Sequence, residues 1–337
     1  MNKYLLLFTG FIFMSLTSIA HPSWGIVVDK NKNIYFADIA HNGRGSVWKL
    51  TKEGKLELLF KDFHAHNVNL DNNGNLITAH GEMDEHTMIR LHANGFIDTL
   101  FHANDYRIFN GGNCTYTPKG EIIFSANHYL WRLNEQGVKE KISKHYFEWN
   151  QTIYVDEDGN YYAPDIGDGK GKLVKIDTNG IAEVIAQNLI TKINRPYDKH
   201  ADVLMGITKG CDGNIYVAEL AGQRIIKISE KGAVETFYQF KDDWKPTGID
   251  FFSGDAYILA YKEKNGHAGP RIVKIDESGN LSEVFNFETH KKDESIESTP
   301  INNRVNRTLL ILILTTLPVM IVLLYRLKKI WQQKTIT

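Results

Sequence analysis

The chain has 337 residues, a formal net charge of −1 and a hydrophobic content of 42%. This charge balance, without a basic run before the C-terminal region, excludes nucleic acid as an expected partner. Two cysteines, Cys114 and Cys211, can form at most one bridge, so a disulfide framework is excluded as well. The content of 27 Gly, 15 Tyr and 17 Phe against 8 Pro favours strands and turns over helices.

Residues 1–20 predict a secretory signal peptide. Lys3 provides a short basic start, an apolar stretch follows, and Ser18 and Ala20 occupy the small-residue positions of a cleavage site before His21. We therefore expect the chain that follows to lie outside the cytoplasm. An uncleaved membrane anchor is the alternative interpretation of the same segment.

The segment 21–287 contains six copies of one unit. The clearest copy reads MGITKGCDGNIYVAELAGQRIIKISEKGAVETFY, and another, WGIVVDKNKNIYFAD, opens the series. The copies begin at Trp24, His66, Asn113, Gln151, Met205 and Thr247. Each holds four short alternating runs joined by Gly, Asn and Asp turns, which is the pattern of a four-stranded antiparallel sheet. Because one such sheet cannot bury both faces but six packed radially can, we predict an all-β six-bladed β-propeller without an exchanged strand.

The end of the chain predicts a membrane anchor. Residues 288–307 read as a polar stalk, and residues 308–325 carry no charge over 18 positions, which is just long enough to span a bilayer. The basic tail, residues 326–337, is expected in the cytoplasm by the positive-inside rule. The propeller is therefore expected on the periplasmic or extracellular side of a cell membrane, held by one helix.

The motifs GITKGCDGNIYVAE…RIIKI…G and GIVVDKNKNIYFAD…VWKL…G make the chain resemble two related groups. These are the NHL-repeat propellers and the senescence-marker-protein/gluconolactonase family of six-bladed β-propellers. The resemblance covers nearly all of the chain between the two membrane signals. It implies the fold, whereas the activity stays open because this scaffold hosts lyases, lactonases and pure binding proteins.

In such a propeller, the residue before each GIxxD stretch lines the mouth of the central channel. That position is held by Trp24, His66, Gly112 or Asn113, Gln151 or Asn150, Met205 and Thr247. Gluconolactonase-like enzymes bind a divalent metal at this position through a Glu, two Asn and an Asp. The resemblance therefore makes this position of the chain the place to look for the same ligands. Trp24 stands where the Glu belongs and Met205 where the Asp belongs, so calcium is less expected. The peptidyl-amidoglycolate lyases place three His around zinc there, and His66 alone matches.

A second candidate site lies in the second repeat, where His64, His66, His80 and Glu82 fall at the same end of one hairpin. Imidazole is the commonest transition-metal ligand, and three nitrogens with one carboxylate suit zinc or copper better than calcium. We therefore predict a shared transition-metal or anion site at these four residues. Ordinary polar decoration of loops is the alternative.

Two functions remain open at this point. The first is a membrane-anchored propeller that binds a small molecule, peptide, glycan or protein through its His-rich mouth. Its candidate contact residues are Trp24, Asn113, Asn150, Gln151 and His128. The second is a metal-dependent hydrolase or lyase of the gluconolactonase-like class. The loss of both family carboxylates favours the first.

Overall fold

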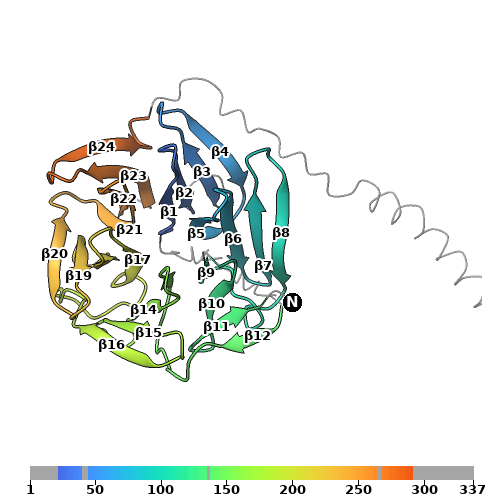
Figure 1. The fold of residues 1–337 in the computed structure, drawn as a ribbon. Helices are drawn as coiled ribbons and strands as arrows, with labels where there is room; N and C mark the ends of the chain where they lie inside the picture. Colours follow the sequence, from blue (N-terminus) through green and yellow to red (C-terminus); the bar gives the residue numbers. More distant parts are fainter. Residues whose placement is uncertain (1–21, 40–44, 118, 135–136, 264–266, 291–337) are drawn as a thin grey trace, which may run out of the picture. The chain divides into compact units, whose positions relative to one another are not determined.

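The computed structural model describes residues 22–39, 45–117, 119–134, 137–263 and 267–290. Within these ranges the chain is all-β and forms six four-stranded antiparallel sheets. Figure 1 shows the sheets arranged as blades around a common centre. The predicted signal peptide, most of the stalk and the predicted membrane span lie outside the described residues. No helix among the described residues is long and apolar enough to cross a membrane.

Each blade takes its four strands from one repeat, in chain order from the centre outward. Blades one and two contain β1 (Ile26–Val28), β2 (Ile34–Asp38), β3 (Ser46–Leu50), β4 (Leu56–Lys61), β5 (Ala65–Leu70), β6 (Leu76–Glu82), β7 (Glu85–Leu91) and β8 (Ile97–Ala103). Blades three and four contain β9 (Cys114–Tyr116), β10 (Ile122–Ala126), β11 (Tyr129–Leu133), β12 (Lys139–Lys141), β13 (Tyr154–Val155), β14 (Tyr161–Asp165), β15 (Lys172–Ile176) and β16 (Ala182–Gln187). Blades five and six contain β17 (Leu204–Lys209), β18 (Ile215–Glu219), β19 (Arg224–Ile228), β20 (Val234–Gln239), β21 (Lys245–Phe252), β22 (Asp255–Glu263), β23 (His267–Ile275) and β24 (Leu281–Asn286). The prediction of six blades without an exchanged strand is confirmed.

One turn recurs between the first and second strands and aligns the blades. In blade one, Asp29 N donates to Asn33 O, and the Asp29 carboxylate accepts the Asn33 N–H. The equivalent backbone bond begins at Asp71, Thr117, Asp156 and Gly210 in the next four blades. Counting back from these turns settles the register that the sequence left open. Gly112 and Gln151, rather than their neighbours, are the equivalents of Trp24.

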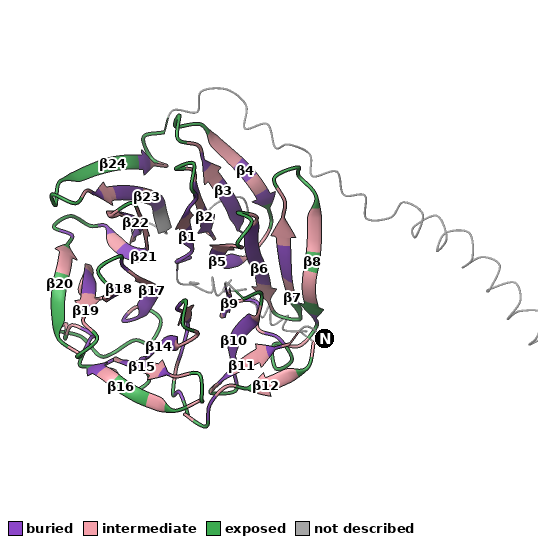
Figure 2. Ribbon diagram, in the orientation of Figure 1, coloured by how far each residue is buried: buried purple, intermediate pink, exposed green. Residues whose placement is uncertain are grey.

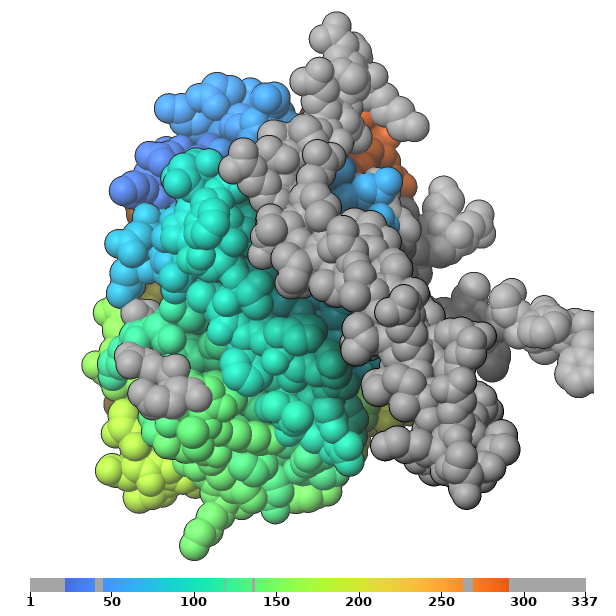
Figure 3. All heavy atoms as spheres, turned by 90° about the vertical axis from the view of Figure 1, so that its right-hand side faces the viewer, coloured from blue at the N-terminus to red at the C-terminus, as the bar shows by residue number. Residues whose placement is uncertain are grey.

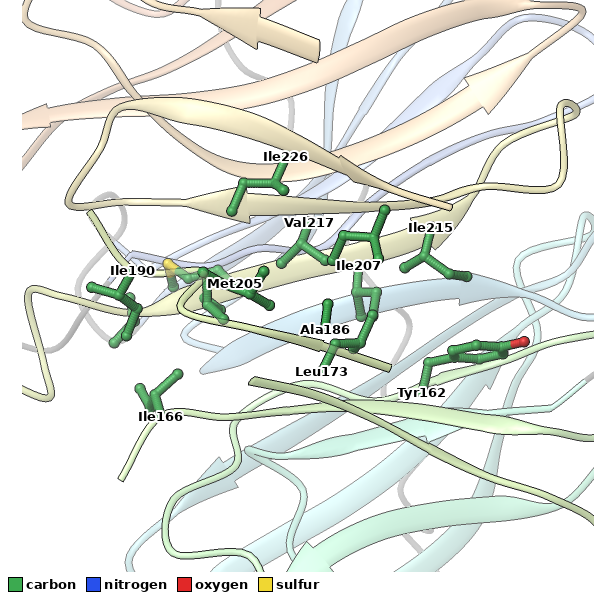
Figure 4. Packing of buried hydrophobic residues seen from close by; sticks show 14 of the residues in the cluster. Tyr162, Ile166, Leu173, Ala186, Ile190, Met205, Ile207, Ile215, Val217 and Ile226 are labelled. Carbon is green, nitrogen blue, oxygen red and sulfur yellow. The ribbon is translucent and has the colours of Figure 1, made fainter. Parts of the chain in front are cut away.

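The core is distributed between the faces of neighbouring blades. Between blades four and five, Leu173, Val217 and Ile226 are fully buried in one cluster (Figure 4). The inner strands are largely buried, whereas the outer strands β16, β20 and β24 carry most of the exposed positions (Figure 2). From the side, the atoms of blade two meet those of blade three directly (Figure 3). Apolar burial of this kind is the main stabilising contribution to folding.

The inner strands are sheet edges, and polar side chains of the preceding blade bind their backbone groups. Asn67 Nδ2 donates to Cys114 O at 3.4 Å, which joins blades two and three. Blade six joins blade one through Asp250, whose Oδ2 accepts the Val28 N–H at 2.8 Å. These bonds satisfy edge groups that would otherwise be left open. Both cysteines are free.

We predict that Asp250→Asn stabilises the protein near neutral pH. Burial raises the pKa of Asp250 to about 6 from its ordinary value of 3.8, although the Val28 N–H opposes this. The folded state therefore favours the protonated acid, and stability falls as pH rises from about 4 to 6. Asparagine keeps an acceptor for Val28 and removes the buried charge, so the unfolding free energy should rise by on the order of 1–2 kcal/mol at pH ~7.5.

Denaturant unfolding at both ends of this pH range measures the effect. The difference between the variant and the wild type should disappear near pH ~4, where both side chains are neutral. If the variant and the wild type are equally stable at neutral pH, or if their difference does not change with pH, the charge of Asp250 is not the cause.

Candidate functional site

Six residues surround the axis at the mouth, the end of the propeller where each inner strand begins. We call this set the axial ring: Trp24, His66, Gly112, Gln151, Met205 and Thr247. In blades two, five and six the register of the inner strand shifts at this level, between Ala65 and Val68, Leu204 and Ile207, and Pro246 and Gly248. Such bulges release residues from regular pairing and change where their side chains point.

Trp24 reaches from blade one to side chains of blades two, four and five. Its side chain is 3% exposed, and its ring centroid lies 4.8 Å from that of His66 in blade two. It also belongs to a hydrophobic cluster whose other members come from blades four and five. A Cβ on Gly248 would lie 2.1 Å from Trp24 O, so blade six must have glycine at this close approach. The predicted contact residue is thus central to the ring but largely covered.

Gln151 contributes a buried hydrogen-bond acceptor to the ring. The residue is 3% exposed, and no donor of the described residues lies within hydrogen-bond distance of its Oε1. Its neighbour in the ring, Gly112, has no side chain, and a Cβ built there would lie 3.9 Å from His66 Cδ2. Leaving a buried acceptor unmatched costs about 1–3 kcal/mol. A donor from water or from a ligand therefore belongs at this position.

Asn113 and Asn150 support the ring from beside it. Asn113 Nδ2 donates to Asn150 O at 3.2 Å and thereby links blades three and four. Asn150 Nδ2 donates to Thr152 O at 2.9 Å and to Pro164 O at 2.8 Å, both within blade four. These bonds turn the Asn150 side chain toward its own blade. The structure therefore gives both predicted contact residues a positioning role, although Asn150 Oδ1, like Gln151 Oε1, is buried without a donor among the described residues.

Three of the predicted metal ligands, His64, His66 and His80, contact one another. Their hydrogen bonds give His80 a different role from the other two. His64 Nε2 lies 3.0 Å from His66 Nε2, so one ring donates to the other. His80 Nδ1 accepts the backbone N–H of His64 at 2.8 Å. A neutral imidazole that accepts through Nδ1 carries its proton on Nε2, and this His80 Nε2 lies 3.8 Å from the Glu85 carboxylate. His80 then has no lone pair to offer a metal, whereas His64 and His66 form a pair.

A comparison between blades explains His80. It pairs with Ala65 in the ladder as Glu219 pairs with Leu204 in blade five. Glu219 accepts the Thr191 N–H from the connection that enters its blade. Asp165 accepts the Trp149 N–H at 3.0 Å in blade four. His80 therefore holds the connection between blades as these carboxylates do, a role that aligning the six repeats at this position could have revealed.

The four predicted ligands do not fit a tetrahedral metal centre in this arrangement. Glu82 ends β6 in register with Glu85, and His80 is committed to the backbone. Within the ranges that the structure describes, no group of three or more His, Cys, Asp or Glu side chains is placed to hold a metal ion. The geometry supports a two-imidazole pair, His64 and His66, beside Trp24.

Other histidines at the mouth also fix loops. His128 lies exposed in the turn between β10 and β11, its Nδ1 donates to Phe147 O at 2.9 Å, and its ring stacks on Tyr146. His86 accepts the Gly111 N–H through Nδ1 at 3.2 Å, and burial lowers its pKa. Some of the histidines at the mouth thus serve to hold loops in place, independently of any ligand. His128 lies one strand outward from the axial ring.

Comparison with known proteins supports the fold. No family model and no curated protein matches the chain in sequence. Among solved structures, virginiamycin B lyase from Staphylococcus aureus matches with a TM-score of 0.51 and 17% identity, over 79% of this chain and 85% of that one. A gluconolactonase from Xanthomonas campestris matches with a TM-score of 0.52 and 12% identity, over 72% and 84% of the two chains.

Another similar structure is a regucalcin, described as a calcium-binding protein, from Agrobacterium tumefaciens. It matches with a TM-score of 0.51 and 14% identity, over 71% of this chain and 82% of that one. The structural neighbours are thus gluconolactonase-like and virginiamycin B lyase six-bladed propellers, as the sequence resemblance implies. Identity at this level shows the shared fold alone.

We predict that His80 stabilises the fold as an acceptor. His80→Ala removes the partner of the His64 N–H and should lower the unfolding free energy by about 1–3 kcal/mol. His80→Asn keeps a side-chain acceptor and should recover a substantial part of this loss. Thermal unfolding of the two variants provides the comparison. Equal destabilisation by Ala and Asn would show that the imidazole acts through packing alone.

Proposed function

We propose that this protein is a binding propeller whose axial ring takes a small, neutral, hydroxylated molecule, such as a sugar or a sugar lactone. The observation that carries the proposal is the buried Gln151 Oε1, which has no donor among the described residues, in the blade that follows the one with the side-chain-free Gly112. A hydroxyl group can donate to Gln151 and accept from an imidazole at once. His66, on the other side of Gly112, supplies such an imidazole.

The chemistry of the ring disfavours a hard cation as its occupant. Its members are indole, imidazole, amide, thioether and hydroxyl groups with one glycine, and none of the six is a carboxylate. Calcium is bound by several oxygen ligands, usually including charged carboxylates. Trp24 instead adds a largely buried apolar ring to the same position. Polar groups on an apolar base are typical of small-molecule sites.

A hydrolase or lyase is the second candidate. It is favoured by the contact of 3.0 Å between His64 Nε2 and His66 Nε2, because coupled imidazoles can exchange a proton near neutral pH. Structural neighbours that are named as a lyase and a gluconolactonase are consistent with it. Among the residues that the structure describes, a metal at this position would have this pair as its nitrogen ligands. Turnover of a lactone by the purified protein distinguishes this candidate from a binding protein.

We predict that Gln151→Met weakens lactone binding without a loss of stability. Methionine has a similar length but cannot accept the ligand hydroxyl, so affinity for galactonolactone should fall at least about tenfold. Because the unmatched oxygen also disappears, thermal stability should stay equal or rise. Calorimetric titration of the full-length protein measures the binding.

Asn150→Ala is the matched control, since it removes two bonds within blade four. That variant should lose stability, through the lost contacts to Thr152 O and Pro164 O. Undiminished lactone binding by Gln151→Met would remove the basis of the proposal. Lactone hydrolysis by the wild type would select the enzyme candidate instead.

Membrane anchoring is part of the proposal and rests on the sequence pattern at both ends of the chain. Protease added to intact cells or spheroplasts should release the propeller, because residues 308–325 should hold it outside the cytoplasm. A tag placed after residue 337 should stay protected under the same conditions. Protection of the propeller with cleavage of the tag would reverse the predicted topology.

A further inference from the structure

A second ring of side chains surrounds the axis, further from the mouth than the axial ring. Each member lies three residues beyond the axial-ring residue of its own inner strand, a rise of about 10 Å in an extended chain. Each also pairs with the equivalent residue of the second strand, as Val27 pairs with Tyr35 and Tyr154 with Tyr162. We call this set the channel ring: Val27, Asn69, Thr115, Tyr154, Thr208 and Asp250.

The channel ring faces an accessible space on the axis. Val27 is half-buried, although both of its neighbours in β1 are buried. Asn69, Thr208 and Asp250 are half-buried as well. The inner strands lie nearest the common centre of the six blades (Figure 1), so the open side of these residues is the central channel. Water and small ions can therefore reach these side chains.

Members of the channel ring interact with one another from different blades. Thr115 Oγ1 of blade three donates to Asn69 Oδ1 of blade two at 3.3 Å. Burial, followed by nearby carboxylates, raises the pKa of Tyr154 in blade four to about 12, and one of these carboxylates is Asp250 of blade six. Blade five separates these two blades along the ring, so the charge of Asp250 acts on Tyr154 across the channel. The members thus surround one shared space.

Asp250 is the single carboxylate of the channel ring. Its Oδ2 accepts the Val28 N–H at 2.8 Å. Burial raises its pKa to about 6 against two backbone N–H groups, and no lysine, arginine or histidine of the described ranges contributes to this pKa. The carboxylate is therefore ionised at pH ~7.5 without a basic side chain to balance it. An enclosed charge without a counter-charge is costly, so a cation in the channel would stabilise the folded state.

The other polar members of the ring supply uncharged oxygens. Tyr154, Thr115 and Thr208 carry hydroxyl groups, and Asn69 carries an amide. Such oxygens coordinate hard cations, and calcium sites usually combine them with several carboxylates. A single carboxylate instead balances one positive charge. The residue types therefore suit a monovalent cation better than a divalent one.

From these observations we infer that the channel ring binds one monovalent metal cation, sodium or potassium, held by the Asp250 carboxylate and the hydroxyl oxygens of Tyr154 and Thr208. The site lies outside the axial ring and does not depend on the function proposed for that ring. It draws on blades four, five and six, and Asp250 also holds Val28 of blade one. A cation bound there links four blades of the folded state and should raise its stability.

Thermal unfolding of the full-length protein at pH ~7.5 tests this inference. Potassium or sodium chloride at about 150 mM should raise the unfolding midpoint by about 2–4 °C over the same concentration of tetramethylammonium chloride. Tetramethylammonium keeps the ionic strength equal but is too bulky to be coordinated by the ring. The salt that gives the larger shift identifies the preferred cation.

Variants of the ring show whether the shift arises in the channel. Asp250→Asn should unfold at the same midpoint in all three salts, within about 1 °C, because it lacks the charge that holds the cation. In tetramethylammonium it should be more stable than the wild type, and the bound cation should narrow this difference. Tyr154→Phe and Thr208→Val each remove one oxygen and should raise the cation concentration for half of the shift at least about threefold.

Two controls make the outcome specific. Asp158→Asn removes an exposed carboxylate from the turn after β13 and should keep the full shift. Gln151→Met should keep it as well, so failure of the axial proposal does not affect this test. Equal midpoints of the wild type in the three salts overturn the inference. A shift that persists in Asp250→Asn overturns it equally, since the cation would then act elsewhere.

Discussion

The packing of blade six against blade one is the constraint on which the rest of the structure depends. Ile26 and Phe36 of blade one share a buried cluster with Leu259 and Tyr261 of blade six. Tyr261 Oη also donates to Ala37 O at 3.2 Å. Without this closure, a sheet face of each terminal blade would be exposed to water.

Closure also creates the axial ring. It brings the first inner strand against the last, where Gly248 accommodates the carbonyl of Trp24. Trp24 can then extend across the axis to the cluster of blades four and five. The ring thereby contains a buried indole, with His66 and Gln151 in the blades before and after that of Gly112. The site is therefore a consequence of the ring and belongs to no single blade.

The fold could be predicted because each of its repeats carries the same local sequence pattern. Alternating runs and turns of Gly, Asn and Asp mark the blades, and the backbone bond of the turn at Asp29 recurs in the next four blades. Side-chain direction was harder to predict. Nothing in the pattern around Trp24 shows that it reaches blades four and five, because its path depends on glycines far along the chain, Gly206 and Gly248. The sequence leaves the register at Gly112 and Gln151 open, and the backbone bonds of the turns define it.

The histidines show the same limit in chemical terms. Sequence spacing places His64, His66 and His80 at one edge, and the structure confirms that they are neighbours. Spacing does not reveal which ring nitrogen accepts a backbone N–H, and that bond decides whether His80 could bind a metal.

The axial ring is buried and formally neutral, so binding at the site proposed there should depend on shape and hydrogen bonds and little on salt.

Elemental analysis of the full-length protein, equilibrated with calcium, zinc and copper and then freed of unbound ions, tests the nature of the axial site most directly. An axial ring without carboxylates, and with His80 bound to the backbone, should retain each metal at well below one equivalent. One equivalent of a metal that is lost on His66→Ala would contradict this and would make the mouth a metal centre.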